Sequence, residues 1–413
     1  MFKMEIETLK DIIVDQEKSF QIRLRSQEII PRDLHIDVDK VFKVPNLLLI
    51  RGPRRAGKSF FAHLLLKDKP YRFFNFDDER LVIDLVDANQ IIEAFHALGD
   101  FEYIIFDEIH YLKGWEKFIA RLRERYKIIV TGSNSELLSK DFGTHLTGRF
   151  ISKAMLPFSF KEYISWKRFK SIGTEEKAKV KKAFMEYLTL GGYPEALLFG
   201  DSYLADLYNS IIIRDIAKAK LRSSLEFRKF AKFSMNNFAS KLSMKKAADT
   251  LKVTSPTAEK YYSLLADNFL LFSFNKYSTK LLEQEQSQKK VYCIDTGIAN
   301  AVNLRFSENK GRLLENIVAI RLYHDVLNLQ ADVFYYDDYQ RECDFLVKHG
   351  NKIDTAIQVT WQLGNDRETD GLLAAMKAFG LKEGFILTLD EERTIQKDGF
   401  IIRVKPVWKW LLE

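Results

Sequence analysis

One eight-residue segment, GPRRAGKS at positions 52–59, constrains the fold of this 413-residue chain more than any other feature. The apolar run 47–50 precedes it and a helical pattern at 60–66 follows it, so the segment lies where a buried strand turns into a helix. Its glycines allow backbone N–H groups to curl around an anion, and the start of the helix adds the positive end of its dipole. The segment therefore predicts a phosphate-binding loop at a strand–helix turn of an α/β fold.

Two side chains of this loop have predicted roles toward a bound ATP. The spacing places Lys58 at the β- and γ-phosphates and the hydroxyl of Ser59 on Mg²⁺. The other loop residues are expected to surround the phosphates mainly through their backbone, and they are Gly52, Pro53, Arg54, Arg55, Ala56 and Gly57.

A pair of acids follows a second apolar strand, 103–106. We expect Asp107 to hold the Mg²⁺ shell and Glu108 to polarise the attacking water. A pair of surface acids after a strand is the alternative interpretation, and the loop upstream favours the catalytic one.

A third apolar strand, 127–131, is followed by Ser133 and Asn134. A polar side chain at either position would lie between the γ-phosphate and Glu108. Farther along, Arg149 is a candidate to contact the γ-phosphate, in its own subunit or in a neighbour's; a structural salt bridge is the alternative for this residue.

The order of apolar segments predicts the architecture. Strands at 46–51, 71–75, 103–106 and 127–131 are separated by helix-length segments, which indicates a parallel sheet with helices on both faces. Residues 160–235 are mainly helical with a Gly-Gly-Tyr-Pro break at 191–194, and 311–413 return to mixed α/β. Further strands are expected at 290–294, 333–336, 343–347, 355–359 and 384–389.

Taken together, the ordered motifs of the chain resemble those of the AAA+ ATPases, and more closely the prokaryotic ATPases that join an AAA domain to a DUF4143-type C-terminal region. The matching segments are GPRRAGKS, YIIFDEIHYLKGWE, IIVTGSN, LTGRF with LPFSFKEY, GGYPEAL, and LLENIVA with ECDFLV. The resemblance implies a P-loop core with a helical leader at 1–160 and a helical lid at 161–235. It also implies a winged-helix-like module at 236–300 and a restriction-endonuclease-like α/β domain at 301–413.

The composition bounds the class of protein. Hydrophobic residues make up 46% and charged residues 29%, as in soluble globular proteins, and no apolar run is long enough to span a bilayer. Cys293 and Cys343 are too few for a disulfide framework or a Cys-rich zinc site. We expect a reduced, cytoplasmic protein without a membrane partner.

Positive charge is concentrated in the middle of the chain. Residues 211–260 hold 12 Lys and Arg against 4 Asp and Glu, an excess larger than the net charge of +7 of the whole chain. This favours an anionic partner, with double-stranded DNA bound through 211–290 as the candidate. A solvated helical face is the alternative.

The same region contains a predicted helix-turn-helix. Helices are expected at 243–251 and 257–272, with Ser255 as the N-cap of the second and Pro256 at its first position. The residues expected near DNA are Thr257, Glu259 and Lys260 on the second helix, and Lys276, Lys280, Lys289 and Lys290 on a following wing. A module that only packs the two ends of the protein together is the alternative, and Glu259 weakens the case for DNA.

Restriction-type nucleases hold Mg²⁺ with a helical Glu, a strand Asp, and a Glu or Gln followed two residues later by Lys. The corresponding positions are Glu315, Asp344, Gln358 and Thr360. Gln358 carries no charge, and Thr360 stands where the lysine should be, so we expect this domain to be catalytically inactive.

The sequence therefore predicts an ATP-binding, Mg²⁺-dependent ATPase that acts as a molecular switch and is associated with DNA. One alternative is an ATP-gated DNA nuclease. Another is a nucleotide-regulated module that binds DNA, a protein partner or further copies of this chain, with little turnover. A small-molecule kinase is disfavoured, because Asp107 and Glu108 suit the activation of water.

Overall fold

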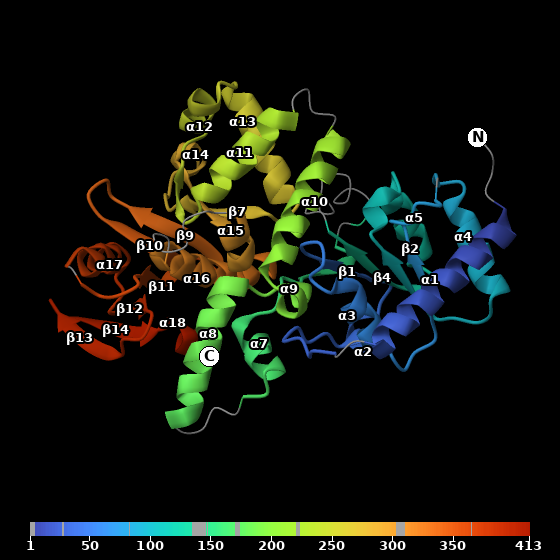
Figure 1. Ribbon diagram of the computed structural model, residues 1–413, viewed down its shortest axis with the longest axis horizontal. Helices are drawn as coiled ribbons and strands as arrows, with labels where there is room; N and C mark the ends of the chain where they lie inside the picture. The colour runs from blue at the N-terminus through green and yellow to red at the C-terminus, as the bar shows by residue number, and fades with distance from the viewer. Residues whose placement is uncertain are drawn as a thin grey trace. The chain divides into compact units, whose positions relative to one another are not determined.

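The computed structural model describes residues 5–26, 29–81, 83–133, 146, 148–169, 174–219, 224–302, 310–364 and 366–413. The chain divides into two compact units, the first ending at Met155 and the second beginning at Leu156 (Figure 1). Among the helices of the described residues, none combines the length and the apolar character that crossing a bilayer requires.

The first unit contains a five-stranded sheet in the order β2-β3-β4-β1-β5, in which every neighbouring pair is parallel. The strands are β1 Leu47–Arg51, β2 Tyr71–Asn75, β3 Tyr103–Asp107, β4 Lys127–Gly132 and β5 Phe150–Ala154. The four strands expected from the sequence are confirmed. The fifth was missed because β5 lies at an edge and is mostly half-buried, so it has no apolar run.

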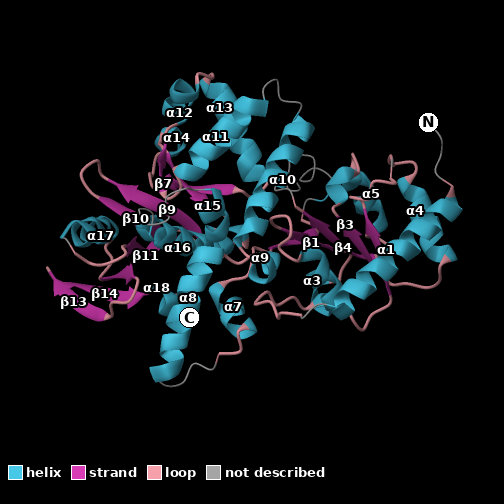
Figure 2. Ribbon diagram, viewed as in Figure 1, coloured by secondary structure: helices cyan, strands magenta, loops and turns pink. Residues whose placement is uncertain are grey.

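Helices cover both faces of this sheet, as Figure 2 shows. Leu47 and Leu49 belong to the core on one face, and Leu48 and Ile50 to the core on the other. This alternation explains the continuous apolar run of β1, because a strand of a parallel sheet is buried on both sides. The helices of the unit are α1 Ile6–Ser26, α2 Val38–Val41, α3 Lys58–Leu65, α4 Ala88–Ala97 and α5 Trp115–Leu122, with a short 3₁₀ helix η1 at Ile109–Tyr111.

The second unit combines helices with a nine-stranded sheet in the order β13-β14-β12-β11-β10-β9-β7-β8-β6. Its strands are β6 Ser240–Leu242, β7 Leu271–Lys276, β8 Lys289–Cys293, β9 Asp332–Asp337, β10 Glu342–His349, β11 Lys352–Val359, β12 Glu383–Thr388, β13 Arg393–Lys397 and β14 Phe400–Pro406. Its helices are α7 Phe160–Trp166, α8 Thr174–Leu190, α9 Pro194–Phe199, α10 Asp201–Ala219, α11 Ser224–Asn236, α12 Met244–Leu251, α13 Ser255–Asp267, α14 Leu281–Gln286, α15 Thr296–Val302, α16 Lys310–Leu327, α17 Asp366–Phe379 and α18 Val407–Trp410.

A single sheet runs through the second unit. β7 pairs in parallel with β9, with Asn275 opposite Phe334 and Lys276 opposite Tyr335. Strands from 236–300 and strands from 301–413 are thus neighbours in one hydrogen-bonded sheet. The division into a winged-helix-like module and a separate C-terminal domain stays a prediction.

The two expected helices of the middle region are present, but the second one begins and ends earlier than predicted. Thr254, and not Ser255, is its N-cap, because the Thr254 hydroxyl accepts the backbone N–H of Thr257 at 3.3 Å. The helix ends at Asp267, and Phe269 adopts a left-handed φ of 54° that turns the chain into β7. The expected extension to 272 is therefore wrong: its last residues are strand.

Candidate functional site

The loop 52–57 connects β1 to α3, where the sequence predicts a phosphate-binding turn. Gly52 has a φ of 153°, and a Cβ there would lie 2.0 Å from the carbonyl oxygen of Met155. Gly57 is the N-cap of α3 with a φ of 91° and no side-chain cap. The first N–H groups of α3 thus face the loop without a capping side chain, which is the arrangement that binds anions.

Lys58 is buried, and its Nζ donates a 2.9 Å hydrogen bond to the carbonyl oxygen of Pro53. The same Nζ lies 3.9 Å from Glu108 Oε1. Burial lowers the pKa of Lys58, and the carboxylates of Glu108 and Asp107 oppose that effect. The ammonium therefore lies inside the loop, next to the two acids that the sequence singled out.

Ser59 and Asp107 are in direct contact. The Ser59 hydroxyl donates to both carboxylate oxygens of Asp107, at 2.8 and 2.9 Å. Thr131 Oγ1 donates to Asp107 Oδ1 as well. Burial raises the pKa of Asp107 to about 6, and the neighbouring Glu108 adds to the rise. Thr131 was not among the predicted site residues; its signal is a polar residue directly after the apolar run 128–130 of β4.

Glu108 follows β3 in a left-handed conformation with a φ of 51°. Its Oε2 accepts hydrogen bonds from the backbone N–H and the hydroxyl of Ser133, at 3.0 and 2.8 Å. His110 Nδ1 lies 3.3 Å from the same oxygen. Burial by itself would raise the pKa of Glu108, but Lys58, His110 and the Ser133 hydrogen bonds hold it below its ordinary value. His110 was missed; its signal is the histidine two residues after the acid in DEIH.

The remaining predicted site residues have different positions. Arg149 is largely exposed, and its Nη1 lies 3.7 Å from Glu124 Oε1, the structural salt bridge that was the alternative for this residue. Its role toward the γ-phosphate stays a prediction. Asn134 lies outside the described residues. Arg54, in the loop, pairs with Asp77 at 2.9 Å. Arg32, outside the loop, donates to the carbonyl oxygen of Ala56 at 2.8 Å.

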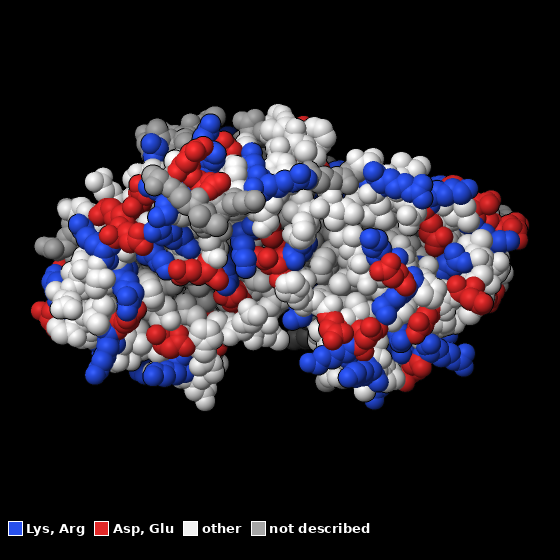
Figure 3. Space-filling view, turned by 90° about the horizontal axis from the view of Figure 1, so that it is seen from below, with Lys and Arg blue, Asp and Glu red and all other residues white. Residues whose placement is uncertain are grey.

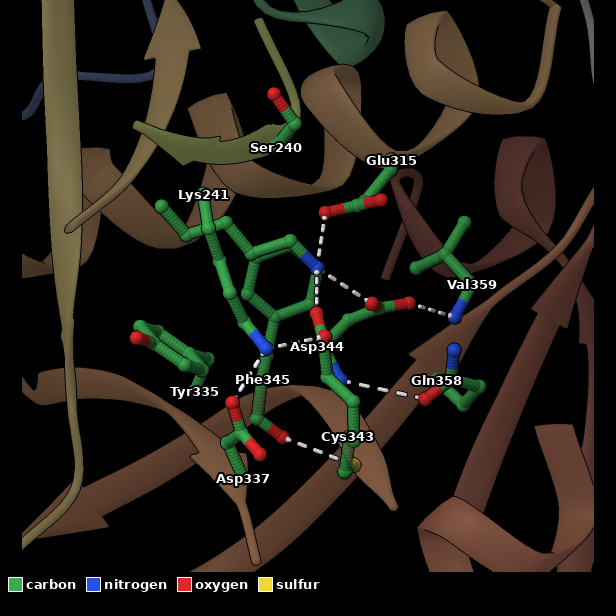
Figure 4. Close-up of polar contacts among 12 residues, drawn as sticks. Ser240, Lys241, Glu315, Tyr335, Asp337, Cys343, Asp344, Phe345, Gln358 and Val359 are labelled. Carbon is green, nitrogen blue, oxygen red and sulfur yellow. Dashed lines mark hydrogen bonds and ion pairs between the residues drawn. The ribbon is translucent and has the colours of Figure 1, made fainter. Parts of the chain in front are cut away.

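A second polar cluster forms in the nine-stranded sheet. Glu315 on α16, Asp344 on β10 and Gln358 on β11 lie together there, as expected from the sequence (Figure 4). Gln358 Oε1 accepts the backbone N–H of Asp344 at 3.3 Å. The Thr360 hydroxyl instead donates to the carbonyl oxygen of Gln362 at 3.1 Å.

The lysine of this cluster comes from an unexpected strand. Lys290, on β8, is buried and pairs with Asp344 and Glu315 at 2.7 and 2.8 Å. The prediction that Lys290 belongs to a DNA-facing wing is therefore wrong, because its ammonium is enclosed by carboxylates. Lys276 is also buried and lies 3.6 Å from Glu283. Sequence alone missed Lys290 because the pair Lys289-Lys290 does not reveal which lysine points inward.

Two family models match the chain. Residues 44–164 match an AAA domain, which confirms the AAA part of the resemblance. Residues 181–310 match a domain of unknown function, DUF8612. This model is a different one from DUF4143, and the DUF4143 assignment stays a prediction.

Similar proteins were found among curated sequences and solved structures. The uncharacterized protein MJ1544 of Methanocaldococcus jannaschii is 32% identical over 94% of this chain and 92% of its own length. An uncharacterized protein of Haemophilus influenzae is 28% identical over 94% of this chain and its own full length (100%). Among solved structures, the Walker-type ATPase paby2304 of Pyrococcus abyssi is 16% identical, with 66% of this chain and 96% of that chain covered and a TM-score of 0.44.

Proposed function

The chain belongs to the family of the Methanocaldococcus jannaschii protein MJ1544 and contains an AAA domain, and on this premise we propose that it is an ATP-binding, Mg²⁺-dependent ATPase acting as a molecular switch. The observation that carries the proposal is the convergence of Lys58, Ser59 and the acids 107–108 at the ends of β1 and β3. Carboxyl ends of parallel strands are the usual place for ligands in such sheets.

The two oxygen groups in contact at this edge suit a magnesium ion. Mg²⁺ prefers oxygen ligands, and the Ser59 hydroxyl and the Asp107 carboxylate lie within hydrogen-bond distance of each other. These two residues would hold the ion, which, when bound, offsets negative charge on the phosphates.

The chain's own groups have distinct tasks in hydrolysis. Lys58 Nζ exchanges the carbonyl oxygen of Pro53 for phosphate oxygens. Glu108 accepts a proton from the attacking water, and its lowered pKa keeps it ionised for that task at neutral pH. Contacts to the γ-phosphate, made before hydrolysis and lost after it, then change the conformation of the helical lid at 161–235 and of the α/β region that follows.

DNA binding through the middle region is a second proposal, supported by the helix pair α12 and α13. Lys245, Lys246 and Lys260 are exposed on these helices, and so is Glu259. On the face drawn in Figure 3, Lys and Arg side chains lie among Asp and Glu side chains, so that face shows no large patch of positive charge. The proposal therefore depends on the exposed lysines of α12 and α13.

Isothermal titration with ATP and Mg²⁺ tests the nucleotide site. Lys58→Ala removes the ammonium that faces the phosphates, and we expect most of the affinity to be lost. Lys69→Ala, which deletes a lysine paired with Asp39 on the surface of the same unit, is the matched control and should bind ATP as the parent does. Equal affinity in Lys58→Ala and the parent would overturn the assignment.

Steady-state turnover tests the proposed base. Glu108→Gln keeps the shape of the side chain but cannot accept the proton, so ATP binding should persist while the rate falls by about 10²–10⁴-fold. Glu93→Gln, an exposed change on α4, is the control. Hydrolysis by Glu108→Gln at the parent rate would show that Glu108 is not the base.

A further inference from the structure

The ammonium of Lys290 lies at the centre of three carboxylates in the second unit. Its Nζ contacts each of them at hydrogen-bond distance: Asp344 at 2.7 Å, Glu315 at 2.8 Å and Glu342 at 2.9 Å. The acids come from α16 and β10, and the lysine comes from β8. We call Lys290 and these three acids the carboxylate cage.

Each acid of the cage is held by a second donor. Asp344 Oδ2 accepts a 2.8 Å hydrogen bond from the backbone N–H of Val359 on β11, drawn as a dashed line in Figure 4. Tyr292 donates to Glu315 Oε1 at 2.8 Å. The third acid, Glu342, pairs through its other oxygen with Lys241 at 2.8 Å. Each carboxylate thus has a second partner that remains when Lys290 is replaced.

Three of the four cage side chains are shielded from water: those of Lys290 and Asp344 are 4% and 6% exposed, and that of Glu315 is 12% exposed. The side chain of Glu342 is 33% exposed and lies at the open edge of the cage. Buried carboxylates that converge on one point need a positive charge between them, because uncompensated buried charge is strongly unfavourable. Burial would lower the pKa of Lys290, but Asp344 and Glu315 hold it well above its ordinary value. The lysine thus stays charged and supplies that positive charge.

With Lys290 in place, no group of acids, histidines or cysteines among the described residues could hold a metal ion. If Lys290 were removed, the three carboxylates would leave oxygens around one point, and oxygens are the ligands of a hard divalent cation. Calcium binds such oxygens at about 2.3–2.6 Å, so the acids would need to move inward by only a few tenths of an ångström from their distances to Lys290. An ammonium and a metal ion therefore compete for the same position.

We propose that Lys290 is the resident cation of the carboxylate cage: its ammonium takes the position of a divalent metal ion, closes the cage to metal, and ties β8 to α16 and β10. The cage then serves to join the region around α12 and α13 to the C-terminal α/β region.

Terbium luminescence tests this on the full-length, nucleotide-free protein. Tb³⁺ takes oxygen ligands as Ca²⁺ does, and Tyr292, in contact with Glu315, lies where it sensitises an ion in the cage. We expect Lys290→Ala to show a saturable Tb³⁺ emission under tyrosine excitation that the parent lacks, saturating at one ion per chain. Emission from an ion at Ser59 and Asp107 would be equal in both proteins. The difference in emission between Lys290→Ala and the parent therefore measures binding in the cage alone.

Matched variants complete the experiment. Lys241→Ala removes the lysine at the edge of the cage and should behave as the parent does, and Lys290→Ala/Glu315→Gln should lose the added emission. The double variant Lys290→Ala/Glu342→Gln, which removes one charge of each sign and keeps Glu315 and Asp344, guards against misfolding of the single variant. A parent emission as strong as that of Lys290→Ala would overturn the proposal, and so would the absence of added emission in both Lys290→Ala and Lys290→Ala/Glu342→Gln when these variants are folded.

Discussion

The hydroxyl of Ser133 donates a 2.8 Å hydrogen bond to Oε2 of Glu108, and the backbone N–H of Ser133 donates a second one to the same oxygen at 3.0 Å. Glu108 and Ser133 are the first residues after β3 and β4, two strands that pair in parallel. Both donors stabilise the ionised carboxylate, because hydrogen bonds to the charged form of an acid lower its pKa.

Ser133→Ala removes the hydroxyl donor and keeps the backbone donor. A hydrogen bond to a charged group contributes about 1.5–3 kcal/mol, so we expect the acid limb of kcat for ATP hydrolysis to move up by about one to two pH units. Affinity for ATP should stay close to that of the parent. The measurement is a pH profile of kcat, with Ser133→Thr, which keeps a hydroxyl, as the control; identical acid limbs in Ser133→Ala and the parent would contradict it.

Gly52→Ala tests the backbone of the loop. The added Cβ would meet the Met155 carbonyl oxygen at 2.0 Å, and the φ of 153° is unfavourable for alanine. We expect a loss of more than about 3 kcal/mol in the free energy of unfolding, measured by urea titration. Gly148→Ala, at a φ of 68° with no atom of the described residues within 4 Å of the new Cβ, should cost only about 1–2 kcal/mol. Equal losses in the two variants would refute the steric argument.

Asp295 makes the stability of the second unit depend on pH. Its carboxylate is buried and accepts N–H bonds from Gly192 and Ile298, at 2.7 and 3.0 Å. Burial raises its pKa from 3.8 to about 6. Between these values the folded chain keeps a proton that the unfolded chain releases, so the contribution of Asp295 falls as pH rises from about 4 to about 6 and is constant above.

The matching variant is Asp295→Asn, which does not titrate. The free energy of unfolding of this variant, relative to the parent, should rise by about 2 kcal/mol between about pH 4.5 and about pH 7. Asp249→Asn, an exposed change on α12, is the control in the same urea titrations. A difference between Asp295→Asn and the parent that does not change with pH would exclude this linkage.

Salt dependence separates a DNA-binding surface from a solvated one. If the exposed lysines of α12 and α13 contact phosphates, replacing Lys245, Lys246 and Lys260 by Ala should flatten the slope of log K against log[salt] by up to about 3 units. Binding should weaken alike for all duplex sequences. Fluorescence anisotropy across a salt series measures this, with Lys177, Lys179 and Lys182 replaced together on α8 as the control. Unchanged slopes would assign α12 and α13 to packing or to a protein partner.

Purified protein should not cut plasmid or linear DNA with Mg²⁺ or Mn²⁺, with or without ATP. Gln358 is uncharged, the Thr360 hydroxyl donates to the backbone of Gln362, and Lys290, which lies against Asp344, is enclosed by carboxylates. The measurement is a gel assay in parallel with Asp344→Ala. Cleavage by the parent that disappears in Asp344→Ala would establish a nuclease.

The sequence predicts where α13 begins more accurately than where it ends. In the middle region, the Thr-Ser-Pro run at 254–256 indicates a helix start to within one residue, but the choice of Thr254 over Ser255 depends on which hydroxyl reaches the N–H of Thr257. The end of α13 depends on tertiary structure, because Leu271 and Phe272 are apolar enough for either element and pair with β8 instead.

The sequence alone predicts the strand–loop–helix at 47–65, the acids that follow β3, and the parallel arrangement of the first four strands, but not their order in the sheet. These features depend on residues adjacent in the chain, where glycine conformations, apolar runs and helix starts act directly. Tertiary structure alone decides that Ser133 holds Glu108 across two strands and that Lys290 turns inward to acids 25 and 54 residues away. The physical reason is that burial and ion pairing depend on which distant segments the sheet brings together. The identities of neighbouring residues such as Lys289 and Lys290 do not show which of them will be buried.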